Sequence, residues 1–92
     1  MPTVDALVIN EKDSVATALR SIQAGEKIQL RVSDKNYQIV TLNDIPIFHK
    51  LALCEIAQGE KIYKYGEIIG EALSIIKAGE HVHSHNTVTL RG

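Results

Sequence analysis

The fold is decided by residues 27–42, which read KIQLRVSDKNYQIVTL. From Ile28 to Val32 apolar and polar residues alternate, and this hydrophobic period of two is typical of a strand with one buried face. Residues 33–36 form a polar cluster of the kind found in turns, and a strand-like pattern resumes over 37–42. The stretch therefore predicts a β-hairpin.

One segment, residues 14–24, predicts a helix instead. Its apolar residues recur at i, i+3, i+4 and i+7 and form a stripe on one helical face: Val15, Ala18, Leu19 and Ile22. Asp13 stands where an N-cap residue would accept backbone hydrogen bonds. Gly25 stands where a C-terminal cap adopts positive φ. We expect this to be the only helix of the chain.

The rest of the chain predicts short strands separated by turn residues. The expected strands are 6–9, 60–63, 67–69, 81–83 and 87–90. This order lacks the regular helices that a βαβ sheet requires. A length of 92 residues allows one compact domain. The fold class is therefore mainly β with one short helix, in a single domain over residues 1–92.

Composition and charge exclude several classes of protein. The chain is rich in aliphatic residues, with 12 Ile, 8 Leu and 7 Val but no Trp. Ten basic and eleven acidic residues give a net charge of −1, which disfavours binding to nucleic acid. The single cysteine, Cys54, rules out an internal disulfide framework. No apolar run approaches ~20 residues and the start lacks signal-peptide features, so we expect a cytoplasmic protein with no membrane partner.

A short motif recurs three times in the chain. Its copies are IQAGEKI at 22–28, IAQGEKI at 56–62 and IKAGEHV at 76–82. In each copy glycine supplies positive φ and a strand begins near the following glutamate. We interpret the motif as a repeated helix-to-strand or turn-to-strand connection. Its three glutamates are therefore poor candidates for catalysis.

The residues best suited to chemistry are three histidines in the segment GEHVHSHN, residues 79–86. On a strand, His81, His83 and His85 would face the same side, spaced roughly 6.6 Å apart, and Val82 would anchor the opposite side. Imidazoles at this spacing are able to converge on one metal ion or one anionic group. The alternative is a solvent-exposed strand whose histidines bind nothing.

Two further segments carry groups suited to binding or catalysis. His49-Lys50 places a cation beside an imidazole, a pair that binds a carboxylate or lowers the pKa of the histidine. Lys64 and Tyr65 lie in the sequence YKYG at 63–66, which interleaves aromatic and basic side chains. The alternatives are an exposed polar pair for the first segment and ordinary strand packing for the second.

Four segments in chain order resemble the SAF domain of altronate and galactarate dehydratases. They are DSVATAL (13–19), HKLAL (49–53), KYGEIIG (64–70) and GEHVHSHN (79–86). The resemblance covers nearly the whole chain and implies a β-clip (SAF-like) fold, which is a small, folded-over domain of strands. One departure is Phe48, because the family usually has glycine before the His-Lys pair.

The resemblance also implies a function, that of a hydro-lyase acting on sugar acids or related 2-hydroxy acids. In that family the domain is fused ahead of a larger catalytic domain, or forms a separate small subunit as in a sulfolactate sulfo-lyase. This chain matches the separate form, so we expect a large catalytic dehydratase subunit as its partner and no activity for the small chain alone. A homo-oligomer is also compatible. The reaction would remove a proton α to a carboxylate and expel water or sulfite.

Residue roles follow from the chemistry of these groups together with the resemblance. We expect catalysis from His49 and Lys50, substrate binding from Lys64 and Tyr65, and binding of Fe²⁺ or a similar divalent metal by His81, His83 and His85. The competing function is a non-catalytic SAF-type module that binds a carbohydrate or a partner protein. A neighbouring gene for a large dehydratase-like chain would favour the lyase.

Overall fold

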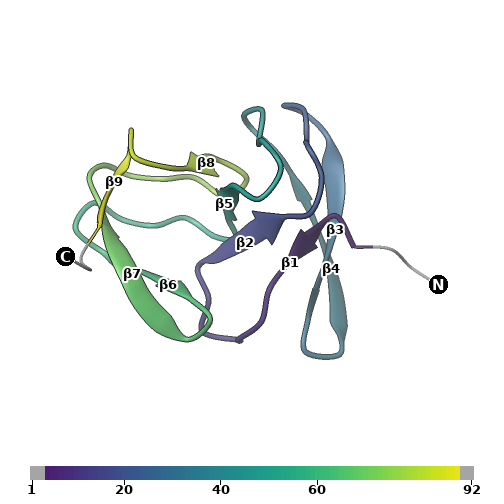
Figure 1. Cartoon of the computed structure of the whole chain (residues 1–92), viewed down its shortest axis with the longest axis horizontal. Coiled ribbons are helices and arrows are strands. Elements are labelled where there is room, and N and C mark those ends of the chain that lie inside the picture. The colour runs from purple at the N-terminus through teal and green to yellow at the C-terminus, as the bar shows by residue number, and fades with distance from the viewer. Residues whose placement is uncertain (1–3, 90–92) are drawn as a thin grey trace.

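The computed structural model describes residues 4–89, and this range consists of strands and turns (Figure 1). One sheet has six strands in the order β4-β3-β1-β2-β5-β8, and the other has three in the order β6-β7-β9. The strands are β1 (Ala6–Leu7), β2 (Val15–Ala18), β3 (Lys27–Val32), β4 (Lys35–Val40), β5 (Lys50–Ala52), β6 (Lys61–Lys64), β7 (Glu67–Ala72), β8 (His81–Val82) and β9 (Thr87–Thr89). The prediction of a mainly β chain is confirmed. Among these residues there is no helix with the length and apolar character needed to cross a membrane.

The predicted hairpin is confirmed as β3 and β4. Their antiparallel register runs from Lys27 opposite Val40 to Val32 opposite Lys35. The turn is shorter than the polar cluster in the sequence, because β4 already begins at Lys35. The predicted strand over 87–90 corresponds to β9, and its last residue, Leu90, lies outside the described residues.

The predicted helix over 14–24 is wrong, because the segment begins with strand β2. The backbone of β2 pairs antiparallel with β1 on one edge and with β5 on the other. Val15 and Ala16 are both buried although they point to opposite faces, so the strand is covered on both sides. Leu19, which a helical stripe would bury, is 40% exposed. Sheet pairing on both edges therefore outweighs the helical spacing of the apolar residues.

Asp13 has a different role from the predicted helix cap. Its carboxylate accepts hydrogen bonds from the backbone N–H groups of Asn10 and Gly66, at 3.2 and 2.8 Å. Gly66 lies between β6 and β7, so Asp13 connects the start of the chain to this hairpin. The side chain is almost fully buried, and these two hydrogen bonds compensate for its burial.

The core is divided into two clusters that meet at β2 and β5, which lie between the β3–β4 hairpin and the β6–β7 hairpin in Figure 1. The first cluster contains Ala6, Val8, Ala16, Ala18, Ile22, Ile28, Leu30, Ile45 and Leu51. The second contains Val15, Ala52, Ile56, Ile62, Ala72, Ile76 and Val82. Because side chains alternate along a strand, successive residues of β2 and β5 enter different clusters. These two strands therefore stabilise both halves of the domain.

The repeated motif forms the same turn in each copy. Its glycines, Gly25, Gly59 and Gly79, have φ between +82° and +86°. The glutamate after each glycine donates its backbone N–H to the carbonyl oxygen three residues earlier, at 3.0–3.2 Å. A strand follows every copy, as β3, β6 and β8. The turn-to-strand interpretation is therefore confirmed.

A fourth copy of this turn occupies residues 45–49, where the sequence lacks the motif. Phe48 takes the glycine position with φ +69°, and His49 donates its N–H to the carbonyl oxygen of Pro46 at 3.0 Å. The four turns form two pairs, joined by the antiparallel bridges Ile22–Ile45 and Ile56–Ile76. Strand β5 follows the fourth copy directly.

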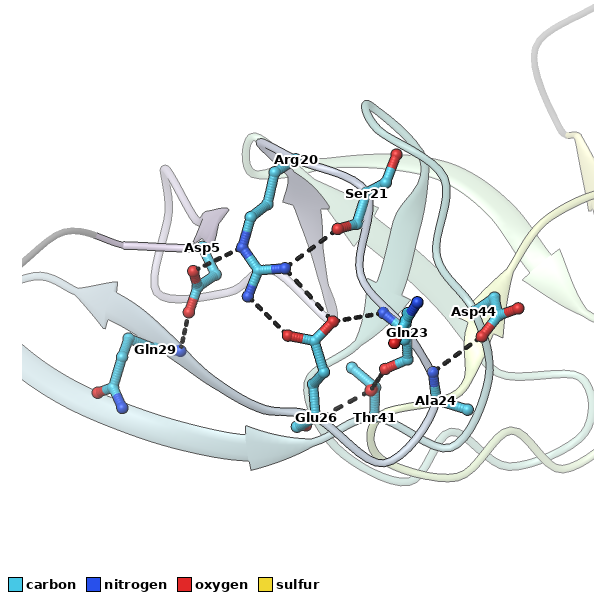
Figure 2. Close-up of polar contacts among 9 residues, drawn as sticks. All are labelled: Asp5, Arg20, Ser21, Gln23, Ala24, Glu26, Gln29, Thr41 and Asp44. Carbon is cyan, nitrogen blue, oxygen red and sulfur yellow. Dashed lines mark hydrogen bonds and ion pairs between the residues drawn. The ribbon is translucent and has the colours of Figure 1, made fainter.

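Side-chain contacts around the first turn explain its glutamate (Figure 2). The carboxylate of Glu26 accepts a hydrogen bond from the backbone N–H of Gln23 at 2.6 Å. It also pairs with Arg20 at 2.9 Å, and Arg20 pairs with Asp5 at 3.0 Å. Glu26 therefore has a structural role: it satisfies a backbone donor and links the turn to the segment before β1.

Candidate functional site

The pairing of two short strands brings the histidines together. β5 and β8 are antiparallel, with Lys50 opposite Val82. His49 directly precedes β5 and His83 directly follows β8, so the register places these two residues opposite each other. Alternation puts the side chains of His49, His81 and His83 on one face of the strand pair, and those of Lys50 and Val82 on the other.

The rings of His49, His81 and His83 stack against one another. Their centroids lie 4.6 to 5.4 Å apart, with interplanar angles of 10° to 30°. Nδ1 of His49 is 3.0 Å from Nε2 of His81, a distance at which one ring nitrogen donates a hydrogen bond to the other. One ring nitrogen from each of the three residues lies within 4.8 Å of the other two.

His85 is placed differently from the alternating strand that the sequence predicted. β8 ends at Val82, and the chain then turns before β9 begins at Thr87. The His85 ring still lies near the group, with its centroid 5.5 Å from that of His81 and its plane tilted by 39°. The group of three mutually close nitrogens contains His49 in place of His85.

Two asparagines hold the backbone that carries these histidines. Asn86 is buried, accepts a hydrogen bond from the N–H of His83 at 3.0 Å and donates one to the carbonyl oxygen of His81 at 2.8 Å. Asn43 accepts a hydrogen bond from the N–H of His81 at 2.9 Å. The buried Asn86 side chain thus closes the turn that ends β8. Sequence reasoning overlooked both residues, although Asn86 belongs to the histidine motif.

The environment of His81 favours the neutral imidazole. Burial lowers the pKa of His81, and the nearby His49, His83 and His85 lower it further. The charge of Lys50 acts in the same direction with a smaller effect. The neutral imidazole is the form that is able to coordinate a metal ion.

Lys50 lines a cavity of about 220 Å³ on the other face of the strand pair. The lining is completed by residues of β6, β7, β8 and β9: Ile62, Ile69, Gly70, Val82, Thr87, Val88 and Thr89. Burial lowers the pKa of the Lys50 amine, and the charge of Lys64 lowers it further. The amine is therefore closer to its neutral form than an exposed lysine would be.

Lys64 and Tyr65 lie at the end of β6 and in the turn before β7. The Lys64 ammonium is 4.9 Å from the centre of the Tyr65 ring, within the range of a cation–π contact. Tyr65 is about half exposed and has φ +56°. The charge of Lys64 thus affects the pKa of Lys50. Neither Lys64 nor Tyr65 belongs to the group formed by the three histidines.

These features define a class of protein: a small β domain built on repeated turns, with an imidazole-rich site where β5 meets β8. The family model for the altronate/galactarate dehydratase SAF domain matches residues 4–90. The chain therefore belongs to this family, and the resemblance of its four segments is confirmed.

Relatives of two kinds share the sequence. The altronate dehydratase of Escherichia coli (strain K12) is 43% identical over 81 residues, and that of Bacillus subtilis (strain 168) is 42% identical over 81 residues. Each match covers 88% of this chain but only 16% of the enzyme. The (2R)-sulfolactate sulfo-lyase subunit alpha of Chromohalobacter salexigens is 35% identical in an alignment of 92 positions that covers 97% of this chain and 98% of that subunit. The chain thus corresponds to about a sixth of the dehydratases and to nearly all of the sulfo-lyase subunit.

Proposed function

We propose that this chain is the small subunit of a lyase that acts on sugar acids or related 2-hydroxy acids together with a separate large catalytic chain. Its family and the names of its relatives, altronate dehydratase and sulfo-lyase subunit alpha, support this proposal. The observation that carries the assignment of the site is the group formed by His49, His81 and His83.

In this proposal the three imidazoles hold a divalent metal, Fe²⁺ or a similar ion. Nitrogens bound to one ion at ~2.1 Å lie roughly 3.0–3.4 Å apart. The 3.0 Å between the His49 and His81 nitrogens falls in this range, and the nitrogen of His83 needs only a small side-chain movement to approach them. Imidazole suits iron, zinc and nickel ions, and a metal held here would supply a Lewis acid on the histidine face of the β5–β8 pair. His49 is then a metal ligand, and His85 stands beside the set.

The basic residues Lys50 and Lys64, which influence each other by charge, suit an acidic substrate. Lys64 and Tyr65 offer an ammonium group and a phenolic hydroxyl to a substrate carboxylate. The Lys50 amine, whose pKa is lowered by burial and by Lys64, accepts the proton α to that carboxylate. The electrons of the broken C–H bond form a C=C bond, and the leaving group departs from the β-carbon as water after protonation, or as sulfite. The enol product then converts to a 2-oxo acid.

A second chain is needed to complete the active site. The cavity beside Lys50 has a volume of about 220 Å³, which is below the ~300 Å³ at which ordinary ligand pockets begin. A catalytic pocket also has to exclude water, and the histidines are partly exposed. A large catalytic subunit that covers both faces of the β5–β8 pair would supply the missing walls.

The test is co-expression with a large dehydratase-like chain encoded near this gene. We expect the two chains to purify together and to convert at least one member of a panel of sugar acids to its 2-oxo product. Lys50→Met should abolish turnover while the chains still assemble. If no such chain associates and the small chain instead binds a carbohydrate without turnover, the chain is a non-catalytic binding module and this proposal is wrong.

A further inference from the structure

The four copies of the turn have the same backbone hydrogen bonds, including the contacts to neighbouring strands. In each, the residue at the glycine position donates its N–H to a strand-end carbonyl oxygen, and the N–H of that strand-end residue returns a bond to the turn. For the turns at 22–26, 45–49, 56–60 and 76–80 these residues are Thr41, Ala18, Ala72 and Ala52; Thr41 directly follows β4, and the others end β2, β7 and β5. The turn at 45–49 therefore has the common backbone although its sequence lacks the Gly-Glu of the other three turns.

Side chains cap three of the turns in the same way. The glutamate carboxylate accepts the backbone N–H of the residue three positions earlier: Gln23 for Glu26, Ala57 for Glu60 and Lys77 for Glu80, at 2.6, 2.8 and 3.0 Å. Figure 2 shows this contact between Glu26 and Gln23. In these three turns the glutamate side chain is therefore hydrogen-bonded to a backbone N–H of its own turn.

The turn at 45–49 differs at both ends of this contact. His49 takes the place of the glutamate, and Pro46 takes the place of the residue whose N–H is capped. Proline has no backbone N–H, so the donor that engages the other three side chains is missing here. His49 instead contacts the rings of His81 and His83.

We propose that the turn at 45–49 presents a ligand where the other three turns present a structural glutamate, and that Pro46 is the positioning residue that frees His49 for the histidine group. This inference deepens the proposed function and rests on it, because the freed ring is one of the three proposed metal ligands. A residue with an N–H at position 46 would offer a hydrogen bond to an imidazole nitrogen of His49. That hydrogen bond would then compete with the metal for the His49 ring.

The main test compares Pro46→Ala with the unmodified chain. In Pro46→Ala we expect slow hydrogen exchange at the new backbone amide of position 46, like that of the capped amides in the other turns. We also expect Co²⁺ affinity reduced about 3- to 10-fold, the factor of one competing neutral hydrogen bond. The matched control is Ala57→Pro, which removes the capped donor of the turn at 56–60. It should lower the denaturation midpoint and leave Co²⁺ affinity unchanged.

A second comparison does not depend on metal. His49→Glu should raise the denaturation midpoint in the Pro46→Ala background, where a donor is available, and should not raise it when Pro46 is present. These two results would show from stability alone that Pro46 removes the backbone donor that would otherwise bind the side chain of residue 49. The proposed role of Pro46 is wrong if His49→Glu has the same effect in both backgrounds while Pro46→Ala shows fast exchange at the amide of position 46 and unchanged Co²⁺ affinity. If the unmodified chain binds no Co²⁺, the metal assignment fails, and the stability cycle still decides whether Pro46 frees residue 49.

Discussion

Nδ1 of His49 lies 3.0 Å from Nε2 of His81, although 32 residues separate them in the sequence. The contact depends on the turn that ends at His49 and on the pairing of β5 with β8. Facing nitrogens at this distance share at most one proton, because two N–H groups would point at each other. Strand pairing therefore assembles the group, and burial together with the neighbouring His49, His83 and His85 lowers the pKa of His81.

Replacing His83 with alanine should weaken Co²⁺ binding by at least ~10-fold, whereas His85→Ala should have little effect. His83 contributes a nitrogen to the group of three, and His85 lies beside it. Titration of each variant with Co²⁺, followed by its visible absorption, measures the difference. The same large loss in both variants would contradict the set of His49, His81 and His83.

Ile28→Ala should destabilise the domain by about 2–5 kcal/mol, because Ile28 is fully buried in the first core cluster. Leu19→Ala should cost only about 0.5 kcal/mol, because Leu19 is 40% exposed after the end of β2. Denaturant titration of both variants gives the comparison. An equal cost would mean that the apolar stripe of a helix over 14–24 describes the packing better than β2 does.

The hairpin and the failed helix show what sequence patterning is able to resolve. An amphipathic strand such as β3 has one buried face, and its alternation is visible. β2 is covered on both faces and paired on both edges, so its burial follows neither period. Val15, Ala18 and Ile22 are indeed buried, but in two different core clusters. Only the tertiary pairing distinguishes the two structures.

The site was predictable where local sequence builds it. His81 and His83 belong to one motif, and His49 was a separate candidate for catalysis. Their proximity depends on the β5–β8 register, which no local pattern reveals. The turn at 45–49 was missed because Phe48 and His49 replace the Gly-Glu of the other copies. Asn43 gave no signal, because its hydrogen bond to His81 spans 38 residues.

Glu26→Gln should make the stability of the domain less sensitive to acid. The contacts of Glu26 with Arg20 and with the Gln23 N–H lower its folded pKa below the ordinary value of 4.5. A carboxyl group with a lowered folded pKa stabilises the fold above its unfolded pKa, and this contribution is lost as pH falls through the folded pKa. Denaturation midpoints between about pH 6 and pH 3 should therefore fall more steeply for the unmodified chain.

The control for this prediction is Arg20→Gln. It removes the first cause of the shift at Glu26 but leaves the hydrogen bond from the Gln23 N–H, so acid sensitivity should fall by less than in Glu26→Gln. Added salt should also reduce the difference between the unmodified chain and either variant, because this ion pair is largely exposed. If both variants lose stability with falling pH as steeply as the unmodified chain, other carboxylates control the acid sensitivity.

Phe48→Gly should be more stable than Phe48→Ala by about 1 kcal/mol, because only glycine adopts φ near +69° without a steric cost. The Phe48 side chain is 69% exposed, so both variants remove similarly little buried surface. Thermal or urea denaturation of the two variants checks the order. The opposite order, which is usual at ordinary exposed positions, would mean that the turn relaxes away from positive φ.

The isolated chain should fold and show no turnover of sugar acids, whereas the complex with a large dehydratase-like chain should be active. The buried apolar residues of the described chain all belong to the two core clusters, and the cavity beside Lys50 is only about 220 Å³. Such a space neither encloses a sugar acid nor excludes water from it. Kinetic assays of the small chain, the large chain and their mixture measure the dependence. Turnover by the small chain alone at the rate of the mixture would show that β5, β8 and their histidines form a complete active site.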